Sequence, residues 1–135
     1  MKRKLLKDVS ALIPNKAFAV GNDLVFIPNF KTSFTDLFKN KVYTLNEIAY
    51  CDLFDNSLLR YASTWAAKEA VYKALKQLNF TKISWKNLEI IREKVAGPPH
   101  VILSQNLDKF NVSLTISHDG NYVWAIALLQ LKESP

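Results

Sequence analysis

Cysteine, glycine and proline are scarce in this sequence, whose 135 residues include one cysteine, three glycines and five prolines. The single cysteine, Cys51, excludes an intramolecular disulfide and is typical of a reducing compartment. So little glycine and proline argues against a disordered or low-complexity chain. Glycine-rich phosphate loops and the H-E-x-x-H, C-x-x-C and G-x-S-x-G motifs are also absent, which excludes several common classes of hydrolase and nucleotide-binding protein.

Long apolar runs are missing as well, since no stretch approaches the ~20 residues that a transmembrane helix needs. The basic start of the chain, residues 1–7, is followed by Asp8 and then by Pro14, Asn15 and Lys16, which interrupt any signal-peptide core. We therefore expect a soluble, cytoplasmic protein that does not associate with membranes.

Apolar residues make up 49% of the chain and aromatic residues 12%, enough for one domain of this length to form a core without disulfides. Lysine and arginine outnumber aspartate and glutamate by 18 to 12, and the net charge of +6 favours acidic partners. The basic residues are dispersed, without an RNP-type motif, zinc-finger spacing or basic heptads. We therefore expect no nucleic-acid partner, and consider a phosphorylated cofactor or an acidic protein instead.

The first predicted element is a strand over residues 18–26, in which apolar residues alternate. Ser33 and Asp36 form a capping-box pattern that predicts the start of a short helix. Thr44 and Glu47 repeat this pattern and predict a second short helix that ends near residue 54.

The longest predicted helix covers residues 58–78, which contain no glycine or proline, with Asn56 or Ser57 as its N-cap. Residues 85–92 and 100–103 are predicted to be strands, and a Gly-Pro-Pro turn separates them.

The clearest pattern is a hairpin formed by residues 112–117 and 122–131, which flank an Asp-Gly turn. Helices and strands are mixed without a regular βαβ alternation. We therefore predict an α+β fold, in which an antiparallel sheet packs against one long helix and shorter helices. This domain is expected over residues 18–132, after a lead-in of residues 1–17.

Glu69 and Lys73 are neighbours at i and i+4 on the long helix, in the stretch Ala-Ala-Lys-Glu-Ala-Val-Tyr-Lys-Ala. This order is typical of an ordinary surface ion pair. The functional alternative is a carboxylate that binds a hard cation beside a lysine that contacts phosphate.

Asp23 interrupts an otherwise apolar strand, where its charge is costly unless it is compensated. Gly21, two residues earlier, permits close approach of another backbone or of a ligand. Taken alone, Asp23 is better explained as a strand-end residue that caps a turn. Together with Glu69 it supplies the one or two carboxylates that usually hold magnesium alongside phosphates and waters.

Ser117, His118 and Asp119 form a third polar cluster, at the predicted hairpin turn. Each has an ordinary structural explanation, since serine and histidine satisfy backbone groups and Asp-Gly favours a turn. The cluster alone therefore identifies no chemistry.

In this order, four segments resemble the holo-acyl-carrier-protein synthase family of phosphopantetheinyl transferases. Residues 21–25 resemble the Gly-x-Asp strand of that family, and residues 65–75 its Lys-Glu-Ala helix with a further lysine one turn on. Residues 97–99 (Gly-Pro-Pro) match a third segment. Residues 115–119 (Thr-Ile-Ser-His-Asp) resemble its Ser-x-Ser-His hairpin, with threonine at the first position. The resemblance extends over residues 19–131.

The resemblance implies an enzyme that transfers 4′-phosphopantetheine from coenzyme A to a serine of an apo acyl carrier protein and releases adenosine 3′,5′-bisphosphate. It implies Asp23 and Glu69 as ligands of Mg²⁺, with Glu69 also a candidate base for the serine proton. Lys73 would contact the phosphate under attack, and His118 would hydrogen-bond the pyrophosphate.

Coenzyme A is also implied to contact Lys68, Gly97, Pro98 and Ser117. Family members of this length form homotrimers with active sites between subunits, so the resemblance implies a homotrimer. The positive net charge suits both coenzyme A and an acidic carrier protein.

Basic residues also lie on or near the helices where the family docks its carrier, although a solvated face explains them equally well; they are Lys31, Lys39, Lys41 and Arg60.

The sequence departs from the family pattern in three places. Thr64 and Trp65 replace Arg-Phe before Ala-Ala-Lys-Glu-Ala, and Lys76 and Gln77 stand where a glycine-rich turn begins. The segment after the early strand also lacks the usual arginines. These changes bear on coenzyme A affinity and carrier choice more than on the metal site.

Two other functions are alternatives. One is a divergent, non-catalytic relative that binds coenzyme A, and the other is a basic module that binds protein or nucleic acid. The basic module predicts steeply salt-dependent binding to polyanions and no magnesium requirement.

Overall fold

The computed structural model describes residues 18–78, 82–93, 95, 97–104 and 107–132. The expected lead-in of residues 1–17 lies outside the described residues. In chain order, the elements are β1 (Phe18–Phe26), α2 (Ile27–Ser33), α3 (Asp36–Val42), α4 (Leu45–Cys51), α5 (Ser57–Lys76), the 3₁₀ turn η1 (Trp85–Asn87), β2 (Leu88–Ile91), β3 (His100–Leu103), β4 (Phe110–Asp119) and β5 (Tyr122–Leu131).

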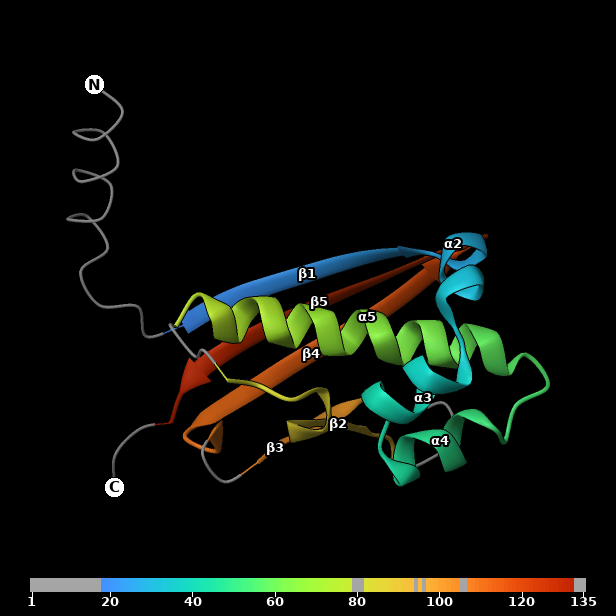
Figure 1. Cartoon of the computed structure of the whole chain (residues 1–135). Helices are drawn as coiled ribbons and strands as arrows, with labels where there is room; N and C mark the ends of the chain where they lie inside the picture. Colours follow the sequence, from blue (N-terminus) through green and yellow to red (C-terminus); the bar gives the residue numbers. More distant parts are fainter. Residues whose placement is uncertain (1–17, 79–81, 94, 96, 105–106, 133–135) are drawn as a thin grey trace.

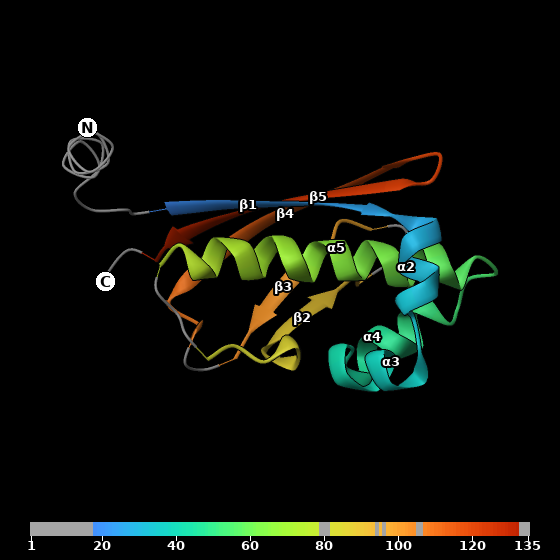
Figure 2. The ribbon, with the colours of Figure 1, turned by 45° about the horizontal axis from the view of Figure 1, so that its top comes forward.

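Helix α5 lies between two layers (Figures 1 and 2). One layer is an antiparallel sheet with the strand order β1-β5-β4. The other contains the antiparallel pair β2–β3 together with helices α3 and α4. This arrangement confirms the predicted α+β fold, with an antiparallel sheet against one long helix.

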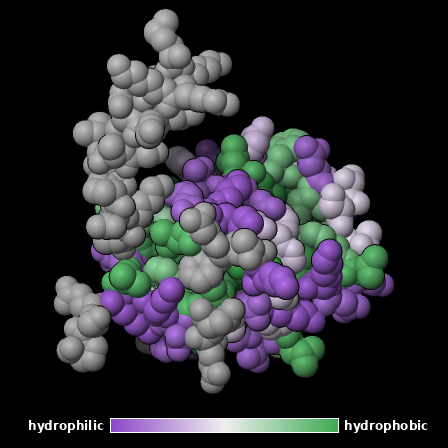
Figure 3. Space-filling model, turned by 60° about the vertical axis from the view of Figure 1, so that its left-hand side comes forward, coloured by the Kyte–Doolittle hydropathy of each residue, from purple (hydrophilic) through white to green (hydrophobic). Residues whose placement is uncertain are grey.

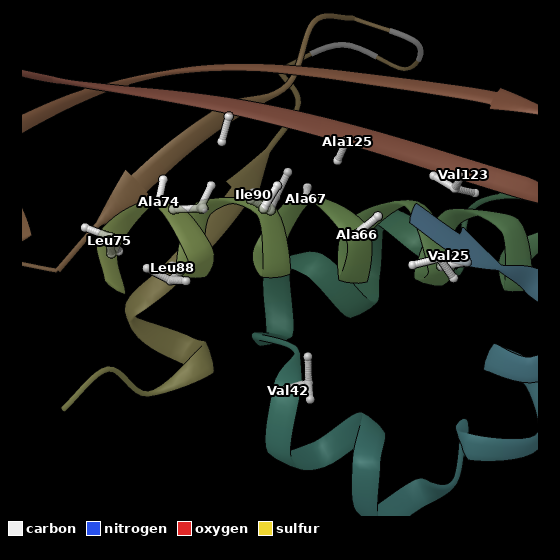
Figure 4. Packing of buried hydrophobic residues seen from close by; sticks show 14 of the residues in the cluster. Val25, Val42, Ala66, Ala67, Ala74, Leu75, Leu88, Ile90, Val123 and Ala125 are labelled. Carbon is white, nitrogen blue, oxygen red and sulfur yellow. The ribbon is translucent and has the colours of Figure 1, made fainter. Parts of the chain in front are cut away.

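Small side chains bring α5 close to the sheet. Ala125 and Ala127 of β5 are fully buried, and so are Ala66, Ala70 and Ala74 of α5. Figure 4 shows alanines of α5 facing β5 across this interface. Because the side chains on both sides are short, the helix and the strands pack at close range.

Gly21 marks the closest approach of β1 to α5. A Cβ atom at this position would overlap the carbonyl oxygen of Ala70 and lie 2.8 Å from the amide nitrogen of Ala74. Both atoms belong to the helix backbone and cannot rotate away. Only glycine therefore fits here, and its absence of a side chain lets the next inward-facing residue, Asp23, reach α5.

The predicted start of the first short helix, with Ser33 as its N-cap, is wrong. Ser33 is not an N-cap, because helix α2 continues through it and Pro28 sits in the first turn of that helix, a position that proline favours. The N-cap of α3 is Thr35, whose hydroxyl accepts a hydrogen bond from the Phe38 amide at 3.2 Å.

The other predicted caps are confirmed. Thr44 and Glu47 form the capping box at the start of α4, and Asn56 caps α5 by accepting from the Leu59 amide at 3.2 Å. Helix α4 ends at Cys51 rather than near residue 54. The strand predicted from residue 85 begins only at Leu88, because the three preceding residues form η1.

The predicted hairpin is present but longer than expected. Asp119 pairs with Tyr122, so the loop consists of Gly120 and Asn121. Gly120 has a φ of 56°, a left-handed conformation that glycine adopts without strain.

Among the described residues, no helix has the length and apolar character that crossing a membrane requires. Hydrophilic and hydrophobic side chains are interspersed over the face of the molecule in Figure 3. Cys51 is a free, buried cysteine.

We expect Gly21→Ala to lower the free energy of unfolding by about 3 kcal/mol or more, because the new methyl group overlaps backbone that cannot yield. Urea denaturation measures the change. Gly120→Ala is the matched control, since it adds only conformational strain and no overlap, and it should cost about 1 kcal/mol. Equal losses in the two variants would contradict the proposed close contact.

Candidate active site

Asp23 and Lys73 meet where β1 crosses α5. The Lys73 ammonium donates to Oδ1 of Asp23 at 2.7 Å and to the carbonyl oxygen of Asn22 at 3.1 Å. The side chain of Asp23 is only 8% exposed, whereas that of Lys73 is 52% exposed. Lys73 therefore forms an ion pair with Asp23 of β1. The surface-pair interpretation, in which Lys73 pairs with Glu69, did not include this contact.

Glu69 lies one turn before Lys73 and is half-buried. Burial, hydrogen bonding to Asp23 and the negative charge of Asp23 together raise the pKa of Glu69 to about 7, although the positive charge of Lys73 opposes the rise. The two carboxyl groups therefore lie close enough to repel each other when both are ionised.

The carboxylate pair has the chemistry of a cation site. Oδ2 of Asp23 is buried and has no hydrogen-bond partner among the described residues, which is a costly state. A divalent cation between the two carboxylates would coordinate the unpaired oxygen and reduce the electrostatic repulsion between Asp23 and Glu69. Magnesium commonly uses one or two carboxylates together with phosphate oxygens and waters, so this donor set fits Mg²⁺. The described residues contain no group of three or more acidic, histidine or cysteine ligands.

The carboxylates open into a cleft of about 410 Å³ between β1, α2, α3 and α5. Trp65 forms part of its wall and packs against Phe38 at 5.0 Å between ring centroids. The other apolar residues of the wall are Leu24, Val25, Phe26 and Phe30. A low-polarity wall strengthens electrostatic interactions at the carboxylates.

His118 lies in a second pocket, of about 230 Å³. Gly97 and Pro99 from the turn before β3 line the same pocket, as do Arg60 and Arg92. We call this the arginine pocket. The sequence motifs at residues 97–99 and 115–119 are thus brought together, as expected for one binding site.

Aromatic rings hold both arginines in place. The Arg60 guanidinium lies 3.9 Å from the ring centroid of Phe54, and that of Arg92 lies 5.3 Å from the ring centroid of Tyr50. Arg92 also donates to the Tyr50 hydroxyl at 2.9 Å. Neither arginine forms a salt bridge with a carboxylate in the described part of the chain. Their positive charge is therefore available to an anion.

Lys68 lies outside both pockets. It is fully buried, and its ammonium donates to Oε1 of Glu47 and to the carbonyl oxygen of Leu88, each at 2.7 Å. Burial lowers the pKa of Lys68, and the charge of Glu47 opposes this effect. The expected contact between Lys68 and coenzyme A has no basis in this position, so we omit Lys68 from the proposed cofactor contacts.

Two further expected residues lie near the arginine pocket without lining it. Pro98 is exposed beside Gly97, and Ser117 is exposed on the outer face of β4, opposite Trp124. Sequence reasoning missed Arg92 as a site residue and assigned Arg60 to carrier docking, because no local motif marks residues that only tertiary packing brings together.

Known proteins resemble this chain in sequence and in fold. Residues 19–127 match the family model described as the 4′-phosphopantetheinyl transferase superfamily. The chain is 31% identical over 119 residues to holo-acyl-carrier-protein synthase of Fusobacterium nucleatum, covering 82% of this chain and 96% of the relative. It is 34% identical over 114 residues to the synthase of Chlorobaculum parvum, covering 82% and 97%.

Solved structures of acyl-carrier-protein synthases have the same fold as this chain. The Chronobacterium ammoniagenes ACPS–CoA complex superposes with a TM-score of 0.74 at 26% identity, covering 87% of this chain and all of that one. The Helicobacter pylori synthase in complex with coenzyme A gives a TM-score of 0.69 at 26% identity, covering 82% and 99%. The family match and the fold thus define a phosphopantetheinyl transferase-like protein. The chain belongs to the 4′-phosphopantetheinyl transferase superfamily.

The raised pKa of Glu69 predicts a pH-dependent effect of Glu69→Gln. Because its pKa of about 7 exceeds the ordinary value of 4.5, the folded state binds this proton more tightly, and the free energy of unfolding falls as pH rises between these values. At pH 8 without metal, Glu69→Gln should therefore be more stable than the wild type by about 1–2 kcal/mol, a figure reduced for partial solvent screening.

At pH 4.5 this advantage should disappear, because the wild-type carboxyl group is then protonated. Urea denaturation in EDTA at both pH values measures the difference, with the exposed Glu93→Gln as control. An equal effect of Glu69→Gln at both pH values would contradict the close approach of the carboxyl groups.

Proposed function

We propose that the protein transfers 4′-phosphopantetheine from coenzyme A to a serine of an apo acyl carrier protein. The observation that carries this proposal is the carboxylate pair of the buried Asp23 and the half-buried Glu69, with one unpartnered oxygen, beside the Lys73 ammonium. Relatives named as holo-acyl-carrier-protein synthases, and neighbours solved with coenzyme A, support the choice of substrates.

In the proposed reaction, the serine hydroxyl oxygen bonds to the β-phosphorus of coenzyme A. The bond from that phosphorus to the oxygen bridging to the α-phosphate breaks, and adenosine 3′,5′-bisphosphate leaves with the bridging oxygen. Such a transfer depends mainly on positioning and on stabilising charge. The protein therefore needs a cation site, a positive side chain and a base, all of which the cleft offers.

Asp23 and Glu69 would hold Mg²⁺, which when bound neutralises charge on the pyrophosphate and polarises its oxygens. Lys73 remains close to the same phosphate and offsets the charge that develops during transfer. Glu69 accepts the serine proton directly or through a water. His118 hydrogen-bonds the pyrophosphate region.

The arginine pocket would bind the nucleotide portion of coenzyme A. Arg60 and Arg92 supply two positive charges that aromatic rings hold in place, and guanidinium groups match phosphate geometry. Thr64 stands where the family pattern has arginine, and its hydroxyl donates to the carbonyl oxygen of Arg60, one turn earlier. Arg60 thus has its guanidinium one helical turn from position 64, where the family pattern has arginine.

The two pockets lie on opposite sides of α5. Arg60 and Glu69 are nine residues apart, which is two and a half helical turns and about 14 Å along the axis. Within the described residues, the two pockets share no lining residue. We therefore assign them to active sites formed between neighbouring subunits of a homotrimer, in which each coenzyme A meets the carboxylate cleft of one subunit and the arginine pocket of the next.

The outer face of the sheet supports such an assembly. Phe18 and Leu24 on β1 and Tyr122 and Trp124 on β5 are about half exposed or more, at 59%, 61%, 49% and 50%. Leu24 and Trp124 are paired in the strand register. Large apolar side chains that gather on one face usually mark an interaction site.

An acidic acyl carrier protein is the expected protein substrate. Lys31 on α2 and Lys39 and Lys41 on α3 lie on the helices that border the carboxylate cleft. Electrostatic complementarity of this kind increases the rate of encounter. We place the reaction in the cytoplasm, for which the free Cys51 offers support.

The alternatives predict different behaviour. A non-catalytic relative would use the carboxylate pair and Lys73 to bind coenzyme A but would transfer nothing to a carrier protein. A basic module that binds protein or nucleic acid needs neither the carboxylates nor the aromatic-walled cleft. The carboxylate pair therefore argues against the basic module, and a transfer assay separates the enzyme from the non-catalytic relative.

Intact-mass analysis of an apo acyl carrier protein tests the function. With this protein, coenzyme A and Mg²⁺, the carrier should gain the mass of one phosphopantetheine group. EDTA and Asp23→Ala should each lower the initial rate at least 100-fold, because the cation site is lost. Asp55→Ala, at an exposed acidic residue outside the cleft, is the matched control and should leave the rate unchanged.

Loss of the arginine pocket should change a different kinetic parameter in the same assay, the KM for coenzyme A. Arg60→Ala combined with Arg92→Ala should raise the KM for coenzyme A about tenfold or more, with a smaller effect on kcat, because lost phosphate contacts weaken ground-state binding. No mass gain with several carriers and a folded wild-type protein would support the non-catalytic alternative. Transfer that persists in EDTA would reject the metal site.

A further inference from the structure

Helix α5 is buried over most of its circumference. The buried residues are mostly small; they are Tyr61, Ala62, Ser63, Thr64, Ala66, Ala67, Lys68, Ala70, Val71, Ala74 and Leu75. Only a narrow side of the helix, which includes Glu69 and Lys73, is partly or fully exposed. An amphipathic helix is oriented by its apolar stripe. Small side chains on both packed sides constrain the rotation of α5 only weakly, so polar contacts help to specify which residue faces which layer.

Lys68 provides such a contact on one side of α5. Its ammonium reaches Glu47 of α4 and the carbonyl oxygen of Leu88 in β2, and both charged side chains have no solvent exposure. Glu47 is itself fixed, because its carboxylate accepts from the backbone amides of Thr44 and Ile90, each at 2.8 Å. The Lys68–Glu47 pair therefore joins α5 to two neighbouring elements at one point.

The opposite side of α5 is attached to β1. Gln77 donates to the carbonyl oxygen of Val20 at 2.6 Å, and Lys73 donates to that of Asn22 at 3.1 Å. Gln77 follows Lys68 by nine residues, or two and a half turns, and so points in the opposite direction. Polar contacts thus hold α5 from both layers, and Glu69 lies between the two sets.

We propose that the buried Lys68–Glu47 ion pair is a positioning element that sets the rotation of α5, so that Glu69 faces Asp23 at the correct distance for a shared Mg²⁺. Neither residue touches substrate or metal. This inference rests on the proposed function, because it concerns the geometry of the same metal site.

The metal site is sensitive to a small rotation of α5, because the carboxylate of Glu69 lies far from the helix axis. The carboxylate of a glutamate lies roughly 6 Å from the helix axis, so a rotation of about 10° moves it by about 1 Å. Magnesium requires oxygen ligands near 2.0–2.1 Å in almost ideal octahedral geometry. A small rotation that the alanine-rich core tolerates would therefore weaken the metal site. A buried ion pair adds little net stability but can specify one arrangement among several.

Two variants separate positioning from stability. Lys68→Met removes the ammonium and leaves the charge of Glu47 buried and unpaired, so it should destabilise the fold. Lys68→Met combined with Glu47→Gln leaves a neutral pair, so it should recover much of the lost stability. The binding of Mn²⁺ alone, followed by the EPR signal of the free ion, gives the metal affinity, and urea denaturation gives the stability.

We expect both variants to bind Mn²⁺ about tenfold more weakly than the wild type, as is usual when the support of a metal ligand is removed. In the transfer assay, the KM for Mg²⁺ should rise similarly, with little change in the KM for coenzyme A. Leu129→Ala, a buried truncation in β5, is the control: it should destabilise the fold and leave the Mn²⁺ affinity of the folded protein unchanged.

The outcomes distinguish the two proposals. A double variant with recovered stability and wild-type Mn²⁺ affinity would overturn the positioning role and leave the proposed function intact. A loss of affinity in Leu129→Ala equal to that in the double variant would also overturn the positioning role. A folded wild-type protein that binds no Mn²⁺ would overturn the metal site and the positioning role together.

Discussion

Where Gly21 meets the backbone of Ala70, strand β1 and helix α5 come closer than any side chain on the strand would allow. This contact decides where the polar groups of β1 lie. Two residues along the strand, the carboxyl group of Asp23 reaches the Lys73 ammonium and the carboxyl group of Glu69. If the strand were displaced outward by the width of a methyl group, the three charged groups would separate and the cation site would be lost.

Helix α5 carries charged residues on two of its sides. Toward β1 it presents Glu69 and Lys73, which remain partly accessible to a ligand, and toward β2 it presents Lys68, which is sealed in the core with Glu47. The accessible pair leaves a carboxylate oxygen unsatisfied, whereas the sealed pair satisfies its charges internally. Adjacent residues in the same motif therefore serve different purposes, one chemical and the other structural.

Sequence patterns predicted what depends on local interactions. Alternation predicted β1, the Asn56 cap predicted the start of α5, and the Asp-Gly pair predicted the hairpin turn. Asp23 and Glu69 were predicted as partners through family resemblance, because 46 residues separate them. The burial of Lys68 could not be predicted, since it depends on α4 and β2, which contact α5 only in the folded chain. Arg60 and Arg92 were missed as residues of the arginine pocket for the same reason, whereas Gly97 and His118 of that pocket were predicted. Ser33 was predicted as a cap in place of Thr35 because helix α2 had not been predicted.

The central claim is that Asp23 and Glu69 form one cation site, and the titration of Glu69 tests it most directly. In protein labelled with ¹³C at glutamate side chains, the carboxyl resonance of Glu69 should titrate with a pKa of about 7 in the absence of metal. Addition of Mg²⁺ with adenosine 3′,5′-bisphosphate should lower this pKa well below its metal-free value, because a bound cation favours the ionised form. A metal-free pKa near its ordinary value of 4.5, or a raised pKa that Mg²⁺ leaves unchanged, would contradict the account.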